Sequence, residues 1–272
     1  MIKTSLKRVF CFLLLSQMAS INSVLADTAN TLKTLHDMRI TSYAILGDYY
    51  MFSGLEGDSR YSRDINTGIN AFEKSLTEIT KDLRKEKELA TIVSHWQSYK
   101  TLVETNRNDF LSQGYASARL VGQLGDDVTQ LNISIVKAYK AIESAQALPM
   151  SEWIQITRDM SLIISTLTAE YSARGTSSMG QIMAIKINDQ GMEHQAKLFG
   201  NHLDTLKKAP GQDVSIAKSI DQVGGKWLFI AKSIANYNEN SVPFIVNSYG
   251  DRISKNLQTI GLYYAKQPSA AQ

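Results

Sequence analysis

Two tryptophans of the chain, Trp96 and Trp227, stand in matching rows of apolar residues. In both rows the apolar side chains recur at steps of 3, 4, 3 and 4 residues, the spacing of one face of a packed α-helix. The rows are Leu89, Ile92, Trp96, Tyr99 and Val103, and Ile220, Val223, Trp227, Ile230 and Ile234. A chain that repeats one such packing face must build its core from helices. The pattern therefore predicts an all-α fold.

Other matches follow in the same order along the chain, which predicts that one helical unit occurs twice. The recurring positions are Asp37-Met38 with Asp159-Met160, Phe72 with Phe199, and Gly125-Asp126 with Gly250-Asp251. The offset between partners varies between 122 and 131 residues, with values of 122, 127, 131 and 125 in chain order. This variation is expected if the loops changed in length while the helices kept their pattern.

Four prolines, at 149, 210, 243 and 268, separate the periodic segments, since a proline inside a helix costs about 3 kcal/mol. Eight helices fit the pattern, and they divide into two four-helix up-down units at residues 27–148 and 149–264. A disordered tail is expected at 265–272. Two bundles in series, joined by a nearly continuous helix through residues 115–176, would make an elongated rod. A single eight-helix body is the alternative.

The first 26 residues have the pattern of a secretory signal peptide rather than of a folded segment. Lys3, Lys7 and Arg8 precede a short apolar run, and small residues at Val24 and Ala26 form a cleavage site. The apolar run is too short for a membrane span, which needs about 20 residues. We therefore expect a periplasmic protein that is exported and cleaved near Ala26.

Removal of this segment changes the charge balance and the cysteine count. The whole chain has 29 basic and 26 acidic residues, and the first 26 residues hold three basic ones and no acidic one. The mature chain is then formally neutral, which gives no support to a nucleic-acid partner. The only cysteine, Cys11, leaves with the signal peptide, so packing alone must stabilise the mature fold.

Reactive side chains do not gather in the sequence. The four histidines, His36, His95, His194 and His202, are never three or four residues apart, which argues against a helical metal site. No nucleophile motif, phosphate-binding loop or dinucleotide fingerprint is present. We therefore expect no enzyme activity, no metal and no cofactor.

Tyrosines and arginines gather where the first helical hairpin turns. They are Tyr43, Tyr49, Tyr50 and Tyr61, with Arg39, Arg60 and Arg63. Guanidinium groups and hydroxyls of this kind bind small anions or aromatic ligands. The alternative is that Tyr49 belongs to the core, that Tyr43 and Tyr50 lie at its boundary, and that the arginines pair with nearby acids.

The segment Arg39-Ile40-Thr41-Ser42-Tyr43, which follows Lys33, resembles the Arg-Met-x-Ser-Tyr stretch of NarX-type nitrate sensors. The wider resemblance is to the PilJ-type N-terminal sensory domain of pilus-linked chemotaxis transducers, an all-α bundle outside the cytoplasmic membrane. In those nitrate sensors the motif's arginine comes from both subunits and grips one anion on a dimer axis. The resemblance thus implies ligand binding by Arg39 and Tyr43, and it leaves open a homodimer.

The chain departs from that pattern in three respects. Leu35 and His36 replace small residues before the motif, and Ser161 stands in the second copy where Arg39 stands in the first. No second membrane span or cytoplasmic signalling domain follows, so a membrane receptor or envelope complex would have to supply the output. The resemblance therefore implies a PilJ-like sensory domain in tandem, without a signalling domain of its own.

Three hypotheses about the function remain. The first is a sensory or ligand-binding module that takes a small anion and works with a membrane receptor or envelope complex. The second is a structural or assembly adaptor that docks onto a pilus, secretion or envelope complex without a small ligand. The third, an enzyme, is the weakest because the reactive cluster is missing. We favour the sensory or ligand-binding module.

Overall fold

The computed structural model describes residues 3–83, 87–145, 150–176, 191–237 and 241–267. For residues 3–26 and for Asp82 only the backbone is described. The predicted signal peptide therefore lies outside the residues whose side chains the structure shows. Within the part that the structure describes, no helix holds an apolar stretch long enough to cross a membrane.

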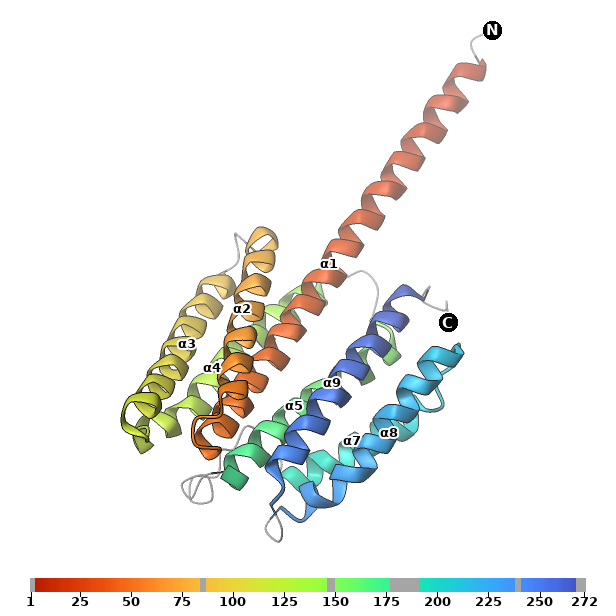
Figure 1. Cartoon of the computed structure of the whole chain (residues 1–272). Coiled ribbons are helices and arrows are strands. Elements are labelled where there is room, and N and C mark those ends of the chain that lie inside the picture. Colours follow the sequence, from red (N-terminus) through yellow and green to blue (C-terminus); the bar gives the residue numbers. More distant parts are fainter. Residues whose placement is uncertain (1–2, 84–86, 146–149, 177–190, 238–240, 268–272) are drawn as a thin grey trace.

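The described ranges contain eight helices and no strand, which confirms the predicted all-α class (Figure 1). The helices are α1 (Lys3–Gly54), α2 (Ser59–Asp82), α3 (Lys87–Gln113), α4 (Ala118–Ser144), α5 (Glu152–Thr176), α7 (Met192–Leu206), α8 (Val214–Ala235) and α9 (Pro243–Lys266). The last helix extends two residues into the predicted tail, of which residues 268–272 lie outside the described ranges.

Local sequence signals set several helix ends. Gly57 has a φ of 85° in the turn after α1, a conformation that glycine adopts without a steric cost. The Asp58 carboxylate then caps α2 by accepting a hydrogen bond from the Arg60 N–H at 2.8 Å. Asp213 caps α8 in the same way, 2.9 Å from the Ile216 N–H. Pro243 begins α9, where its missing N–H leaves no hydrogen bond unmade.

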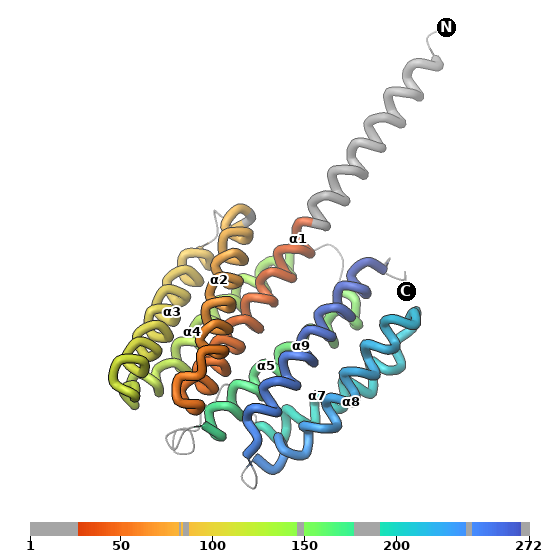
Figure 2. The backbone as a smooth tube through the Cα atoms, in the orientation of Figure 1, coloured from red at the N-terminus to blue at the C-terminus, as the bar shows by residue number. Residues whose placement is uncertain are grey.

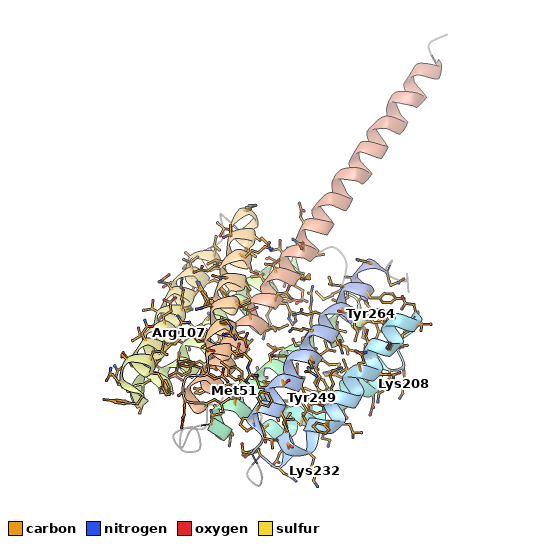
Figure 3. All side chains as sticks on the ribbon, viewed as in Figure 1. Met51, Arg107, Lys208, Lys232, Tyr249 and Tyr264 are labelled. Atoms are coloured by element: carbon orange, nitrogen blue, oxygen red, sulfur yellow. The ribbon has the colours of Figure 1, made fainter. Side chains whose placement is uncertain are left out.

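Each group of four helices has its own apolar core. In the core of α1 to α4, Phe72 stacks on Trp96 with 3.8 Å between ring centroids. In the core of α5, α7, α8 and α9, Phe199 packs on Trp227 at 4.2 Å. Met51 lies in the first core and Tyr264 in the second (Figure 3). These matching ring pairs agree with the predicted duplication, which itself stays a prediction from the sequence.

The two groups lie side by side and meet along α1 and α5 (Figures 1 and 2). The Gly47 α-carbon faces Ala169, and Gly54 faces Thr176, so the two helices run in the same direction with a constant register. Ala169 and Ala173 of α5 also belong to the first core. The fold is therefore a pair of bundles with one shared seam.

The expected rod with a nearly continuous helix through residues 115–176 is wrong. Helix α4 ends at Ser144 and α5 begins at Glu152, and α5 lies along α1 rather than beyond it. The physical reason is the row of small residues on the facing sides of α1 and α5. Small side chains let two backbones approach closely, and lateral packing then buries more apolar surface than an end-to-end joint.

Candidate functional site

Helix α5 is the central helix of the molecule, flanked by α1 and by α9. Small residues allow α9 to approach closely: Gly250 lies against Thr168, and Gly261 lies against Thr157. Helices α1 and α9 run in opposite directions over α5. We call the surface between them, with α5 as its floor, the α1–α9 groove.

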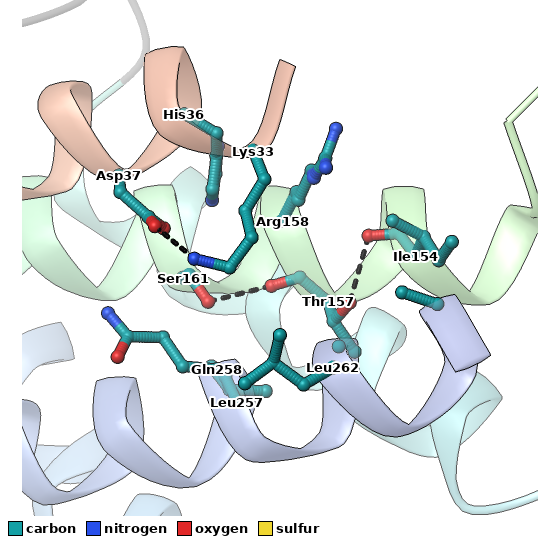
Figure 4. A pocket seen from close by; sticks show the side chains of 12 residues that line it. Lys33, His36, Asp37, Ile154, Thr157, Arg158, Ser161, Leu257, Gln258 and Leu262 are labelled. Atoms are coloured by element: carbon teal, nitrogen blue, oxygen red, sulfur yellow. Dashed lines mark hydrogen bonds and ion pairs between the residues drawn. The ribbon is translucent and has the colours of Figure 1, made fainter. Parts of the chain in front are cut away.

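Two cavities lie in this groove. The larger one, of about 90 Å³, is lined by residues of α1, α5 and α9 and is shown in Figure 4. We call it the Ser161 cavity. The smaller one, of about 40 Å³, lies further along the same three helices and is lined by Tyr43, Gly47, Thr168 and Asn247, among others. We call it the Tyr43 cavity.

His36 reaches from α1 into the Ser161 cavity (Figure 4). Its side chain is only 6% exposed, and no described residue hydrogen-bonds to its ring. Burial lowers the pKa of His36 well below its ordinary value, and the positive charges of Arg158, Arg39 and Lys33 add to that shift. The ring is therefore neutral at pH 7, with one N–H donor and one acceptor nitrogen.

Hydroxyls and an ion pair complete the polar part of the Ser161 cavity. The Thr157 hydroxyl donates to the Ile154 carbonyl at 2.8 Å, and the Ser161 hydroxyl donates to the Thr157 carbonyl at 2.8 Å. Each of these hydroxyl oxygens can still accept a hydrogen bond. Lys33 Nζ lies 2.5 Å from Asp37 Oδ2 in a half-exposed pair, so these two charges largely cancel. Leu257 and Leu262 of α9 supply apolar wall.

The structure places the two predicted ligand residues, Arg39 and Tyr43, one turn apart on α1. Tyr43 is buried and lines the smaller cavity, and burial raises its pKa to about 12 while the charge of Arg39 opposes the rise. Arg39 is half-buried and does not line either of these two cavities. Its Nε is buried without a hydrogen-bond partner among the described residues.

Burial lowers the pKa of the Arg39 guanidinium, while Tyr43, Asp159 and Tyr139 oppose that shift. Tyr139 belongs to α4 and Asp159 to α5, so Arg39 lies near the side of the seam where α4 packs. Arg158 also reaches α4, because its guanidinium donates to the Tyr139 hydroxyl at 2.8 Å. Arg39 and the Ser161 cavity thus lie on opposite sides of the contact between α1 and α5. His36 lines the cavity, and the charge of Arg39 also acts on its ring.

The other members of the tyrosine–arginine cluster serve the fold. Tyr49, Tyr50 and Tyr61 are buried in the first core, so the expected boundary position of Tyr50 is wrong, and Tyr43 is likewise buried. Arg60 pairs with Asp58 and lies over the Tyr61 ring, 4.6 Å from its centroid.

Ser42, from the segment that resembles nitrate sensors, is fully buried. Its hydroxyl accepts a hydrogen bond from the Asn132 amide at 2.8 Å, and its carbonyl accepts one from the Tyr99 hydroxyl at 2.9 Å. These bonds tie α1 to α3 and α4, which gives this serine a structural role in the first core.

Acidic side chains meet where α1, α2 and α9 come together. Burial raises the pKa of Asp48 well above its ordinary value, and the charges of Asp251 and Asp64 add to the rise, while the Asn247 amide opposes it. Desolvation and the charge of Asp64 also raise the pKa of Asp251, to about 6, while Lys255 opposes that rise. Because Asp251 has an exposed surface, solvent screens its contribution and Asp48 carries more of the effect. At a pH between its unfolded and its folded pKa, a carboxyl whose pKa is raised by folding keeps its proton in the native state and loses it in the unfolded state.

Asp48 and Asp251 therefore contribute stability that is lost as the pH rises from about 4 through about 6 and beyond, whereas His36, whose pKa is lowered by folding, contributes in the opposite direction below pH 6.5. The contribution of His36 is the same in the wild type and in Asp48→Asn, so the difference between these two proteins isolates the carboxyl. Asp48→Asn should raise the melting temperature at pH 7.5 by more than it does at pH 5. Asp126→Asn, at an exposed position on α4, should keep the wild-type profile. An effect of Asp48→Asn on the melting temperature that is the same at pH 5 and pH 7.5 would contradict this assignment.

In the described ranges, no three His, Cys, Asp or Glu side chains gather in a way that could hold a metal ion. Among the histidines, His95 has its Nδ1 2.7 Å from the Ser134 hydroxyl, across the α3–α4 contact. The grouping of Lys33, His36, Arg158 and Ser161 was not predicted from the sequence. The signal that could have revealed it is the difference between Arg39 and Ser161 at matching positions of the two copies.

Comparison with protein-family models, with curated proteins and with solved structures finds no match for this chain. The assignment of its site therefore rests on the geometry described above.

Proposed function

We propose that this chain is a non-enzymatic ligand-binding module of the bacterial envelope, exported across the cytoplasmic membrane, that passes its signal to a membrane receptor or envelope complex. The observation that carries the proposal is the α1–α9 groove, where two cavities lie in a row at the junction of the two bundles. Binding pockets are commonly found between helices of bundles and where two structural units meet.

The groove is suited to signalling because its walls belong to both bundles. Helix α1 comes from the first bundle, whereas α5 and α9 come from the second. A ligand that contacts all three helices favours the arrangement in which the bundles sit at one particular distance and angle. Binding energy can then shift the population of bundle arrangements, provided that the ligand prefers one of them.

A structural or assembly adaptor is the second candidate, and one surface feature favours it. Leu228 and Phe229 are neighbours on the outer side of α8, 80% and 59% exposed. Large apolar side chains that lie together on a surface mark protein contacts. This role would need no small ligand, so the two candidates predict different results with ligands and with surface variants.

A thermal melt of the purified chain against a panel of compounds tests the proposal. The panel holds small inorganic anions, short carboxylic acids, amino acids, aromatic acids and small amines. A ligand at 100 times its Kd adds about 2.7 kcal/mol of stability, which corresponds to roughly 5–10 °C for a chain of this size. We expect at least one compound class to raise the melting temperature in this way.

Variants then locate the bound compound and separate the two candidates. A shift that is lost in Arg39→Ala but kept in Arg119→Ala, an exposed arginine on α4, assigns the ligand to the sequence-predicted residue. A shift that is lost in Ser161→Met assigns it to the groove. A flat panel, combined with envelope association that disappears in Leu228→Ser/Phe229→Ser, would replace the binding module by the adaptor.

A further inference from the structure

The Ser161 cavity exists at a position where the two copies of the predicted repeat differ. Because Gly47 faces Ala169 and Gly54 faces Thr176, each residue of α1 lies level with the residue 122 places later on α5. Arg39 and Ser161 are partners in this register, and so are Asp37 and Asp159. Two parallel helices in such a register present matching residues to opposite sides of their seam.

On the α4 side of the seam, the long side chain of Arg39 lies near Asp159 and Tyr139. On the α9 side, its partner Ser161 is short and lines the cavity, close to Asp37, the partner of Asp159. The cavity is therefore the volume that an arginine side chain would fill if both copies carried one. The cavity lies on the α9 side of the contact between α1 and α5, and Arg39 lies at the matching position on the α4 side.

The charges around the cavity decide what kind of ligand fits it. Asp37 is already paired with Lys33, which takes the role that a second arginine would have had. Since the charges of Lys33 and Asp37 largely cancel, the charges left to act on His36 are Arg158 from α5 and Arg39 from α1, both positive, and α9 lines the cavity with uncharged residues only. A buried donor in a positive field, with no protein partner, suits a negatively charged acceptor.

The volume and the walls of the cavity set the size of the ligand. An apolar cavity of about 150 Å³ holds benzene, so about 90 Å³ has room for roughly four non-hydrogen atoms, as in acetate, and the fifth atom of propionate extends to the solvent-exposed edge at Leu262, which is 44% exposed. Leu257 and Leu262 offer apolar contact opposite the polar end at His36. The ligand should thus have one charged end and a short hydrocarbon part.

We propose that the Ser161 cavity binds a short-chain monocarboxylate, such as acetate or propionate. Its carboxylate accepts a hydrogen bond from the His36 ring, and its hydrocarbon part lies against Leu257 and Leu262. This inference rests on the proposed binding function and names the ligand class for one of its two cavities. A ligand of this size should bind with a Kd between about 0.1 and 10 mM.

The test is a ligand-observed NMR titration of the full chain with propionate at fixed ionic strength. Propionamide, a neutral compound of the same shape, and propylamine, a cation, are titrated in parallel. We expect saturable binding of propionate in the stated range and binding at least tenfold weaker for the other two compounds.

Five variants test the placement. Ser161→Met fills the cavity and should weaken propionate binding at least tenfold, whereas Ser161→Ala keeps the space and should bind within threefold of the wild type. Loss of a donor to a charged group costs about tenfold or more, so His36→Leu should bind weakly, while His36→Gln keeps a donor and should bind within a few-fold. Leu262→Trp, at a position that is 44% exposed, closes the cavity from α9 and serves as a second filling variant if Ser161→Met does not fold.

Two kinds of result would overturn the inference. Equal propionate affinity in the wild type and in a folded cavity-filling variant would place the ligand elsewhere. Binding of propylamine instead of propionate would contradict the carboxylate assignment. The assignment would also be wrong if none of the three compounds binds. The proposed binding function would then still be decided by the wider panel of compounds, through Arg39 or the Tyr43 cavity.

Discussion

Replacing Trp96 with alanine is expected to lower the free energy of unfolding by about 3–5 kcal/mol. The indole is 3% exposed, stacks on Phe72 at 3.8 Å and lies 6.2 Å from the Tyr99 ring. Its removal deletes the stacking contact with Phe72 of α2 and leaves a cavity in the first core. Urea unfolding followed by circular dichroism measures the loss.

Trp227→Ala should cost a similar amount, because Trp227 is 8% exposed and packs on Phe199 in the second core. The two residues belong to separate cores, so the effects should add in the double variant within about 0.5 kcal/mol. Trp153→Ala is the matched control, since this third tryptophan is only half-buried and should cost less. A neutral result for Trp96 or Trp227 would show that the helix register used for the duplication is wrong.

The helices could be predicted from the sequence because the residues that determine each helix lie close together in the chain. Apolar steps of three and four residues fix which face of each helix is buried, and the structure shows that this face of each copy carries a phenylalanine–tryptophan contact, Phe72 with Trp96 and Phe199 with Trp227. The caps that the structure shows at Asp58 and Asp213 are equally local, because each side chain bonds only within its own first turn. These features do not depend on how the two bundles pack together.

The position of the two bundles and the cavities between them could not be predicted in this way. The pairing of α1 with α5 depends on backbone contact at Gly47 and Ala169, and no periodic pattern tells which small residues will meet. His36 looked like an isolated histidine because Arg158 and Ser161, its neighbours in space, lie more than a hundred residues away in the sequence. The resemblance to nitrate sensors pointed to Arg39 in the first copy. The Ser161 cavity lies instead at the matching position of the second copy, where a serine replaces the arginine.

Replacing Gly250 with leucine is expected to lower the free energy of unfolding by about 1–3 kcal/mol. Gly250 lies in the middle of α9, and a Cβ atom there would come within 2.3 Å of the Thr168 hydroxyl oxygen. That hydroxyl donates to the Ile164 carbonyl at 2.7 Å, so Thr168 can give way only by losing a buried hydrogen bond. A leucine must therefore push α9 away from α5 and open the α1–α9 groove.

Gly225→Leu provides the matched control, because Gly225 lies within α8 and a Cβ atom there meets nothing within 4 Å. Leucine favours a helix over glycine by up to about 1 kcal/mol, so this variant should be as stable as the wild type or more stable. Thermal and urea unfolding of the two variants thus give effects of opposite sign for the same substitution. If Gly250→Leu is also neutral, α9 does not approach α5 as closely as the structure shows, and the groove cannot form as described. Since that groove carries both the proposed function and the carboxylate site, Gly250→Leu should also weaken propionate binding, whereas Gly225→Leu should leave it unchanged.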